Sequence, residues 1–195
     1  MNQIEFLQKN KFTRKIIYKL GRSRAKKMVK NIEKYFNKTD KILDIGSGIC
    51  NICEILKEEN FNVTPLDIKN LSFVDNIEPI IYNGDKIPFD DNEFDVALIS
   101  TVLHHCRKPE EIIKEAKRVS KRIVIIEDIY LNEIHKHLTY FFDSLINLEF
   151  TGHPHTNKTN EGWQALFKKL NLKLKDVKYA NSYLVFKQAM YYLEK

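Results

Sequence analysis

An aspartate followed closely by two glycines is the stretch of the sequence with the clearest capacity for chemistry. Residues 41–45 are mostly apolar, which favours a strand buried on both faces, and Gly46 and Gly48 then turn the chain sharply. Apolar residues recur at helical spacing over 50–59. A strand, a glycine turn and a helix N-terminus let backbone N–H groups meet a ligand at close range. Asp44, inside the strand, favours a ligand with a positive amino group over a bare phosphate.

A second acid follows at a distance that suits a nucleoside. Asp67 closes the next predicted strand, 61–67, about 20 residues beyond the glycine turn, where an acid can accept hydrogen bonds from both ribose hydroxyls. The alternative for such a residue is a helix cap or an ordinary surface acid. Pro65 indicates that this strand is not fully hydrogen-bonded on both sides.

The elements that must position these acids alternate along the chain, which predicts an α/β fold. A helix is expected over 109–119, beginning at Pro109, a favoured first-turn residue. An amphipathic helix and a polar loop are expected within 129–162, and another helix follows, capped by Thr159 or Asn160. The remaining strands are expected at 79–82, 94–100, 122–127, 172–179 and 184–193.

Composition sets broad limits on the class of protein. The chain has 195 residues, 43% of them hydrophobic, which predicts one soluble domain over 1–195 with a full core. No apolar run approaches the ~20 residues of a membrane-spanning helix, and no signal peptide is apparent, so we expect no transmembrane segment and a cytoplasmic location.

Basic residues are concentrated near the N-terminus. Residues 1–38 are expected to be helical, with a break at Gly21. The net charge is +6, and the stretch from Lys9 to Lys30 holds the densest group of cations. A solvated helix face is one interpretation. Contact with an anionic partner, such as RNA, a phosphorylated substrate or a membrane surface, is the other.

The run from Leu43 to Gly48 resembles the first motif of class I S-adenosylmethionine (SAM)-dependent methyltransferases, apolar-Leu-Asp-apolar-Gly-x-Gly-x-Gly. Cys50 stands where the third glycine is usual. The run Gly84-Asp85-Lys86-Ile87-Pro88-Phe89 resembles the family's Gly-Asp-x-x-x-apolar-Pro-Phe pattern with one residue fewer, and Phe94-Asp95 entering the fourth strand is also typical. The resemblance covers roughly residues 39–195.

This resemblance implies a Rossmann-like three-layer sandwich around a mostly parallel seven-stranded sheet with an antiparallel last strand. It also implies that the first N-terminal helix of 1–38 folds over the ligand as a lid, while the second packs on the sheet. The insert 129–162, after the fifth strand, is expected to cover the pocket of the methyl acceptor.

SAM is the implied cofactor. By resemblance, Asp85 holds the adenine amino group, and Lys86 and Ile87 flank the adenine ring. The expected cofactor contacts are Asp44, Gly46, Ser47, Gly48, Asp67, Ile68, Asp85, Lys86, Ser100 and Thr101.

His104 and His105 leave the fourth strand beside the expected methyl group, so they are the candidate catalytic bases, with packing as the alternative. No metal site is expected, because the His-x-His pairs of the insert do not share a helix face and the Cys50-x-x-Cys53 pair has no second pair to complete a zinc site. Position alone suggests that Tyr130, His135, Tyr140, His153 and His155 line the acceptor pocket.

The leading functional hypothesis is therefore a SAM-dependent methyltransferase that acts on an O, N or C nucleophile of a small molecule. The run Ser100-Thr101-Val102-Leu103 lacks the Asn/Asp-Pro-Pro-aromatic motif of enzymes that methylate amines of bases. An RNA methyltransferase and a SAM-binding protein without activity remain as alternatives. A dinucleotide dehydrogenase is disfavoured by Asp44 and by Asn51 in place of the third glycine of Gly-x-Gly-x-x-Gly.

Overall fold

The computed structural model describes residues 10–147, 156–182 and 186–195. Its seven strands form one sheet in the order β3-β2-β1-β4-β5-β7-β6. Strands β1 to β5 run parallel, whereas β7 pairs antiparallel with both β5 and β6. The predicted mostly parallel sheet with an antiparallel last strand is confirmed. The strands are β1 (Lys41–Ile45), β2 (Asn62–Asp67), β3 (Ile80–Ile81), β4 (Phe94–Ser100), β5 (Ser120–Ile129), β6 (Lys173–Ser182) and β7 (Phe186–Glu194).

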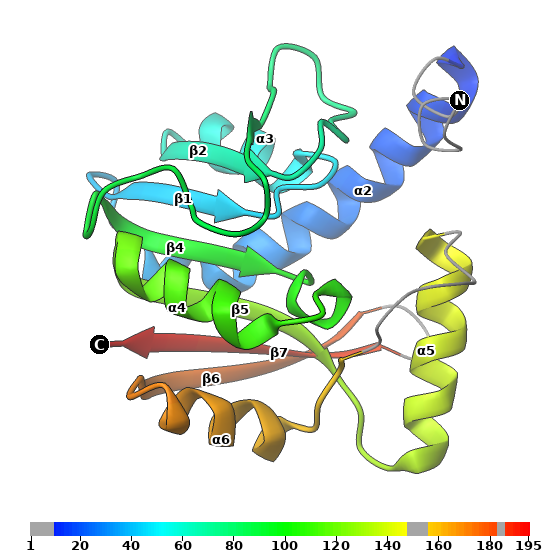
Figure 1. Ribbon diagram of the computed structural model, residues 1–195. Helices are drawn as coiled ribbons and strands as arrows, with labels where there is room; N and C mark the ends of the chain where they lie inside the picture. The colour runs from blue at the N-terminus through cyan, green and yellow to red at the C-terminus, as the bar shows by residue number, and fades with distance from the viewer. Residues whose placement is uncertain (1–9, 148–155, 183–185) are drawn as a thin grey trace.

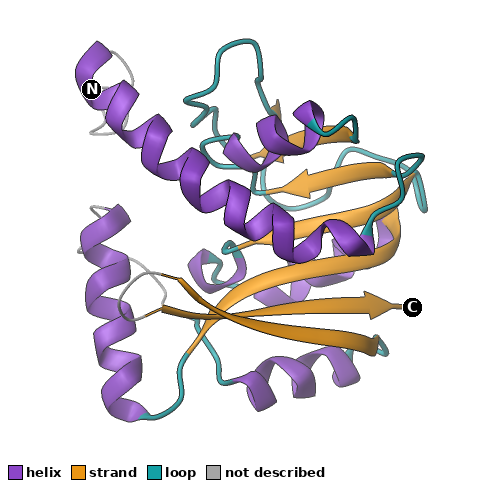
Figure 2. Ribbon diagram, turned by 180° about the vertical axis from the view of Figure 1, so that it is seen from behind, coloured by secondary structure: helices purple, strands orange, loops and turns teal. Residues whose placement is uncertain are grey.

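Helices cover both faces of the sheet and give the three layers that Figures 1 and 2 show from opposite sides. On one face, α2 (Lys11–Ile32) and α3 (Asn51–Glu58) pack over Ile42, Val96 and Val124. On the other, α4 (Pro109–Val119) and α6 (Asn160–Lys169) cover the alternate residues of the same strands. The remaining helices are η1 (Glu33–Tyr35), η2 (Leu103–His105) and α5 (Glu133–Asn147).

The N-terminal segment differs from expectation because Gly21 does not break it. Residues 11–32 form one helix, capped by the Asn10 side chain, which accepts hydrogen bonds from the N–H groups of Phe12 and Thr13. A Cβ at position 21 would collide with the side chains of Ile49 and Asn51. Gly21 is thus an interior helical glycine that allows close approach to the turn after β1. The predicted break at Gly21 was wrong, and residues 1–9 of the expected first helix lie outside the described residues.

The fifth strand is longer at both ends than its apolar run indicated. β5 begins at Ser120 and continues through Ile129, because it pairs with β7 along its last residues. In this register Asp128 lies opposite Gln188. Asp128 therefore lies within the sheet, at the carboxyl end of β5 and beside Gln188 of β7.

The insert keeps its expected helix. α5 spans Glu133–Asn147, and α6 begins at Asn160 after Thr159, whose side-chain oxygen accepts a hydrogen bond from the N–H of Gly162. Residues 148–155, with most of the expected polar loop, lie outside the described residues. Within the described residues, no helix is long and apolar enough to cross a membrane.

Candidate functional site

The turn between β1 and α3 is pinned to the end of β2. The N–H groups of Gly46 and Ser47 both donate to the carbonyl oxygen of Leu66, at 2.8 and 3.1 Å. Gly46 has φ +73°, and a Cβ there would collide with the side chain of Val102. Glycine is therefore required both for the left-handed backbone and for the close approach of the loop after β4. The turn lies at the carboxyl edge of the sheet, where open α/β sheets bind ligands.

Cys50, in place of the usual third glycine, keeps the backbone of a glycine. Its φ is 61°, in the left-handed region, and its side chain is fully buried beside Cys53 in the core under α2. Its Sγ lies 3.7 Å from the Ser47 hydroxyl. Burial raises the pKa of the Cys50 thiol, so this side chain is a neutral core group.

Asp44 is a buried carboxyl group directly beneath the turn. It is 1% exposed, and one of its oxygens accepts a hydrogen bond from the Cys53 thiol at 3.0 Å. Burial raises the pKa of Asp44 to about 6, and the neighbouring negative charge of Asp67 acts in the same direction. A carboxylate held in this way is stabilised by a cationic ligand, since a positive charge nearby favours its ionised form.

Asp67 joins the glycine turn to the end of β2. Its Oδ2 accepts the N–H of Gly48 at 2.8 Å, and its Oδ1 accepts the N–H of Ile68 at 2.7 Å. Oδ1 also accepts the N–H of Lys69 at 3.2 Å, whereas Oδ2 keeps a further lone pair that can accept a ligand hydroxyl. Ile68 is 53% exposed beside this carboxylate, and it is the kind of apolar surface on which a planar ring can rest.

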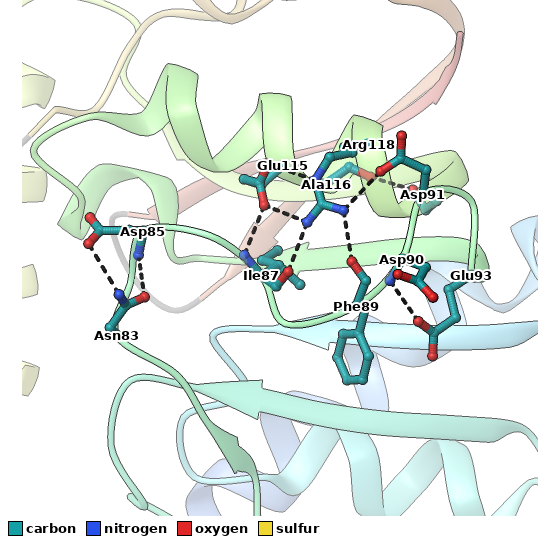
Figure 3. A network of polar contacts seen from close by, with 11 residues as sticks. Asn83, Asp85, Ile87, Phe89, Asp90, Asp91, Glu93, Glu115, Ala116 and Arg118 are labelled. Atoms are coloured by element: carbon teal, nitrogen blue, oxygen red, sulfur yellow. Dashed lines mark hydrogen bonds and ion pairs between the residues drawn. The ribbon is translucent and has the colours of Figure 1, made fainter.

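The loop that follows β3 is anchored to α4, as Figure 3 shows. Arg118 donates to the carbonyl oxygens of Ile87 and Phe89, and Glu115 accepts the N–H of Ile87 at 2.8 Å. Asp85 precedes this anchor and sits in a turn with Asn83, to whose side-chain oxygen it donates its N–H at 3.1 Å.

The three residues of this loop that were expected to contact adenine differ in exposure. Asp85 and Lys86 are exposed, as ligand contacts should be. Ile87, in contrast, is 1% exposed and belongs to the core cluster on the α4 side of the sheet. The prediction that Ile87 flanks an adenine ring is therefore wrong, because its N–H and carbonyl anchors turn the side chain inward.

Backbone strain marks the end of β4. Thr101 is β-branched and nevertheless has φ +54°, held there by its N–H donating to the carbonyl oxygen of Ile126 at 2.7 Å. Strain of this kind is concentrated at functional sites. Ser100 lies immediately before it, and its buried hydroxyl oxygen has no hydrogen-bond partner within the described residues. Both residues lie at the carboxyl edge of the sheet, and their contact with a ligand stays a prediction.

The two histidines after β4 differ in accessibility. His104 is 1% exposed, and its Nδ1 lies 2.6 Å from Oε2 of the fully buried Glu127. Its ring also packs against that of His105, with 4.1 Å between centroids. His105 is partly exposed. The structure thus buries one candidate base as a structural pair and leaves the other nearer to solvent.

The sequence analysis missed a group of buried polar side chains beside this edge. Asp128 is 3% exposed, and its Oδ1 has no hydrogen-bond partner among the described residues. Its other oxygen, Oδ2, lies 3.9 Å from Nη2 of Arg24 on α2. Asn157 donates to the Asp128 carbonyl at 3.4 Å, while its own side-chain oxygen has no partner within the described residues. Burial raises the pKa of Asp128.

Only the alternation of β5 could have revealed Asp128. Val124, Ile126 and Asp128 lie on the face under α2, in step with Ser100 of β4, because side chains alternate along each strand. A carboxylate at the end of an apolar row is a signal for a buried acid.

The insert residues lie around the start of α5. His135 accepts the N–H of Leu131 at 3.1 Å on its ring nitrogen, which gives it a role in the local turn, and Lys136 lies over the ring of Tyr130. Burial raises the pKa of Tyr140. His153 and His155 lie outside the described residues. No group of three metal-ligating side chains is found within the described ranges.

Comparison with known proteins agrees with this arrangement. Residues 43–125 match a family described as a methyltransferase domain. A curated relative, an uncharacterized protein of Methanocaldococcus jannaschii, is 52% identical over 46 residues, which are 24% of this chain and 22% of the relative. The chain thus matches only about a fifth of that relative's length.

Several solved structures share the fold. A SAM-dependent methyltransferase of Methanosarcina mazei is 20% identical with a TM-score of 0.66, and the match covers 84% of this chain and 96% of that protein. Magnesium protoporphyrin IX methyltransferase of Synechocystis, with bound S-adenosylhomocysteine, is 11% identical with a TM-score of 0.65, covering 95% and 88%. Residues 43–125 thus resemble a methyltransferase domain, and the chain as a whole shares the fold of these solved methyltransferases.

Proposed function

We propose that this chain binds SAM at the carboxyl edge of β1, β2 and β4 and transfers its methyl group to a small-molecule acceptor. The observation that carries the proposal is the bond from the Gly48 N–H to Asp67 Oδ2 at 2.8 Å, which joins the turn to the second acid. It sets the group suited to a ribose beside the turn suited to the amino acid end of the cofactor.

Each part of SAM has residues of suitable chemistry. Asp44 lies beneath the turn and suits the ammonium group, and Asp67 suits the two ribose hydroxyls. Ile68 and Lys86 are exposed beside the expected place of the adenine ring. Oδ2 of Asp85 accepts from the Asn83 side-chain amide at 3.3 Å, and its carboxylate keeps further lone pairs for the adenine amino group. The remaining proposed contacts are Gly46, Ser47, Gly48, Ser100 and Thr101.

SAM supplies a methyl group already activated on a sulfonium, so the protein contributes mainly alignment, exclusion of water and, where needed, removal of a proton. The acceptor is proposed to lie over the ends of β4 and β5. There Ser100, Asp128 and Asn157 each have a side-chain oxygen without a hydrogen-bond partner in the described part of the chain, and these oxygens can accept from a hydroxyl or amine. These buried polar atoms favour a small polar acceptor, because leaving them unmatched is costly.

Two residues are candidates for taking up a proton from the acceptor. His105 is partly exposed beside the loop after β4 and is the more accessible histidine. Asp128 has a raised pKa and an unpartnered oxygen, which also suits a base. His104 is proposed to act by positioning, through its contact with Glu127. Tyr130, His135, Tyr140, His153 and His155 are proposed to border the acceptor from the insert.

Calorimetric titration with SAM and S-adenosylhomocysteine, with NAD as the control, tests the cofactor assignment. We expect micromolar binding of both adenosyl ligands and none of NAD. Absence of adenosyl binding would contradict the proposal. Binding of SAM without methyl transfer to any of a broad panel of small hydroxyl and amine compounds would favour the non-catalytic alternative, although the glycine-like backbone of Cys50 gives that alternative no support.

An RNA acceptor is the second candidate, favoured by the basic residues of α2. It predicts steeply salt-dependent binding of RNA together with methyl transfer to RNA from labelled SAM. Transfer to small molecules but not to RNA would exclude it.

A further inference from the structure

The outer side of α2 carries a row of large apolar side chains that remain exposed. Phe12, Ile16 and Leu20 are 73%, 43% and 59% exposed, and their spacing of four residues aligns them along one side of the helix. The residues that bury α2 against the sheet lie nearer its C-terminal end, beginning at Ala25. Aligned apolar side chains of this size mark a surface for a partner.

A second row, made of lysines, accompanies the apolar row. Lys11, Lys15 and Lys19 are exposed and also four residues apart. No ion pair joins any of the three to another residue in the described part of the chain, whereas Arg14 and Arg22 of the same helix pair with acids. The helix contains no acidic residue at all. The apolar row is therefore bordered by uncompensated positive charge.

A third row lies on α5. Ile134, Leu138 and Phe141 are 76%, 43% and 59% exposed, at helical spacing. Figures 1 and 2 both place α5 and the N-terminal half of α2 at the same end of the molecule, beyond the end toward which β1 and β4 point. We call this region, defined by the three rows on α2 and α5, the helical edge.

We propose that the helical edge docks on an anionic lipid surface. Apolar side chains enter the boundary between head groups and acyl chains, and neighbouring lysines bind the lipid phosphates, as in interfacial amphipathic helices. Docking in this way directs the carboxyl edge of the sheet toward the lipid. The inference is independent of methyl transfer, because it concerns only the surface of α2 and α5.

Two other partners, a nucleic acid and a second copy of this chain, fit the helical edge less well. A nucleic acid would use the lysines but would leave Phe12, Leu20 and Phe141 in water. A second copy bound face to face would bring its own lysine row against Lys11, Lys15 and Lys19, because a two-fold interface pairs a surface with itself. A lipid surface satisfies the apolar and the cationic rows together.

Co-sedimentation of the full chain with vesicles tests the proposal. Vesicles of equal parts phosphatidylcholine and phosphatidylglycerol are compared with vesicles of phosphatidylcholine alone. We expect binding to the anionic vesicles only, weakened roughly tenfold or more by K11Q/K15Q/K19Q, because each lysine contributes separately near a charged surface. F12S/I16S/L20S and I134S/L138S/F141S should also weaken it.

The matched control is K41Q/K57Q/K168Q, which removes the same charge from exposed lysines at the start of β1, in α3 and in α6. It should bind anionic vesicles as well as the native chain does. Equal loss in the control and in K11Q/K15Q/K19Q would overturn the proposal, since net charge alone would then explain binding. Circular dichroism and thermal unfolding establish that each variant is folded.

Three further outcomes also count against the lipid surface. Absence of binding to anionic vesicles overturns it directly. Tight binding of transfer RNA that K11Q/K15Q/K19Q abolishes, without vesicle binding, assigns the helical edge to nucleic acid. A dimer in light scattering that F12S/I16S/L20S converts to a monomer, again without vesicle binding, assigns it to a second copy.

Discussion

Nδ1 of His104 lies 2.6 Å from Oε2 of Glu127, and both side chains are almost completely buried. The other oxygen, Oε1, accepts the N–H groups of Val102 and Leu103 at 3.0 and 2.7 Å. One carboxylate on β5 thus holds residues 102–104 of the loop that follows β4. That loop contains the strained Thr101 and the histidine that remains accessible, His105.

Removing one partner of this pair should destabilise the protein. His104→Ala leaves a buried acid without its partner, and we expect a loss of about 3 kcal/mol in the free energy of unfolding. His105→Ala, at a partly exposed position, should cost no more than about 1 kcal/mol. Urea unfolding measures both. Equal stability of the two variants would show that the pair does not hold the loop.

Asp67 should be indispensable for cofactor binding. Asp67→Ala removes the acceptor of the Gly48 N–H and the proposed acceptor of the ribose hydroxyls. Hydrogen bonds to a charged group contribute about 2 kcal/mol, so we expect SAM affinity to fall roughly 30-fold. Calorimetric titration measures the change. Asp85→Ala, which affects an exposed turn, is the comparison and should lose less.

Cofactor affinity should depend on pH through Asp44. Its pKa is raised to about 6 by burial, so lowering the pH protonates it in the free protein, and the neutral form attracts an ammonium group less. SAM affinity should therefore rise from about pH 5 to about pH 7, as the carboxylate ionises. Asp44→Asn should bind more weakly and lose this dependence. An unchanged pH profile in that variant would exclude Asp44 as its source.

The raised pKa of Asp44 should also make the stability of the unliganded protein depend on pH. The pKa of Asp44 in the folded state lies above its ordinary value of 3.8, so the folded state holds the proton more tightly than the unfolded state. This group therefore favours folding at low pH, and its contribution is lost as the pH rises through about 6. In Asp44→Asn that loss should be absent from unfolding curves measured across this range.

Cys50 should tolerate glycine better than any branched residue. Its φ of 61° is strained for a side chain, so Cys50→Gly should fold and bind SAM at least as well as the native chain. Cys50→Val places a β-branched residue in the same conformation and should lose about 2 kcal/mol of stability. Thermal unfolding and titration compare the two. Loss of SAM binding in Cys50→Gly would show that the thiol itself is required.

Replacement of Asp128 should make the protein more stable and less active. Its carboxyl group is buried with one oxygen unpartnered, so Asp128→Asn should raise the free energy of unfolding by about 1 kcal/mol. The same variant should slow transfer to any acceptor that the native chain methylates while leaving SAM affinity unchanged. A variant that is less stable and equally active would assign Asp128 to structure alone.

The sequence by itself determined the sheet, its strands and the place of the glycine turn. Apolar runs bounded by Gly46, Pro109 and Thr159 are local signals, and nearly every element they predicted is present. Asp44 and Asp67 could be singled out because their distance from the turn along the chain is itself the signal. Local pattern suffices where neighbours in sequence are also neighbours in space.

Only the tertiary structure decided which side chains meet across the sheet. Gly21 breaks no helix because Ile49 and Asn51, far along the chain, occupy the space beside it. His104 is paired with Glu127 from another strand, and Asp128 lies near Arg24 of α2, with its Oδ1 left without a hydrogen-bond partner among the described residues. Strand alternation could have indicated that Asp128 is buried, but the choice of partners depends on long-range packing, which no local pattern contains.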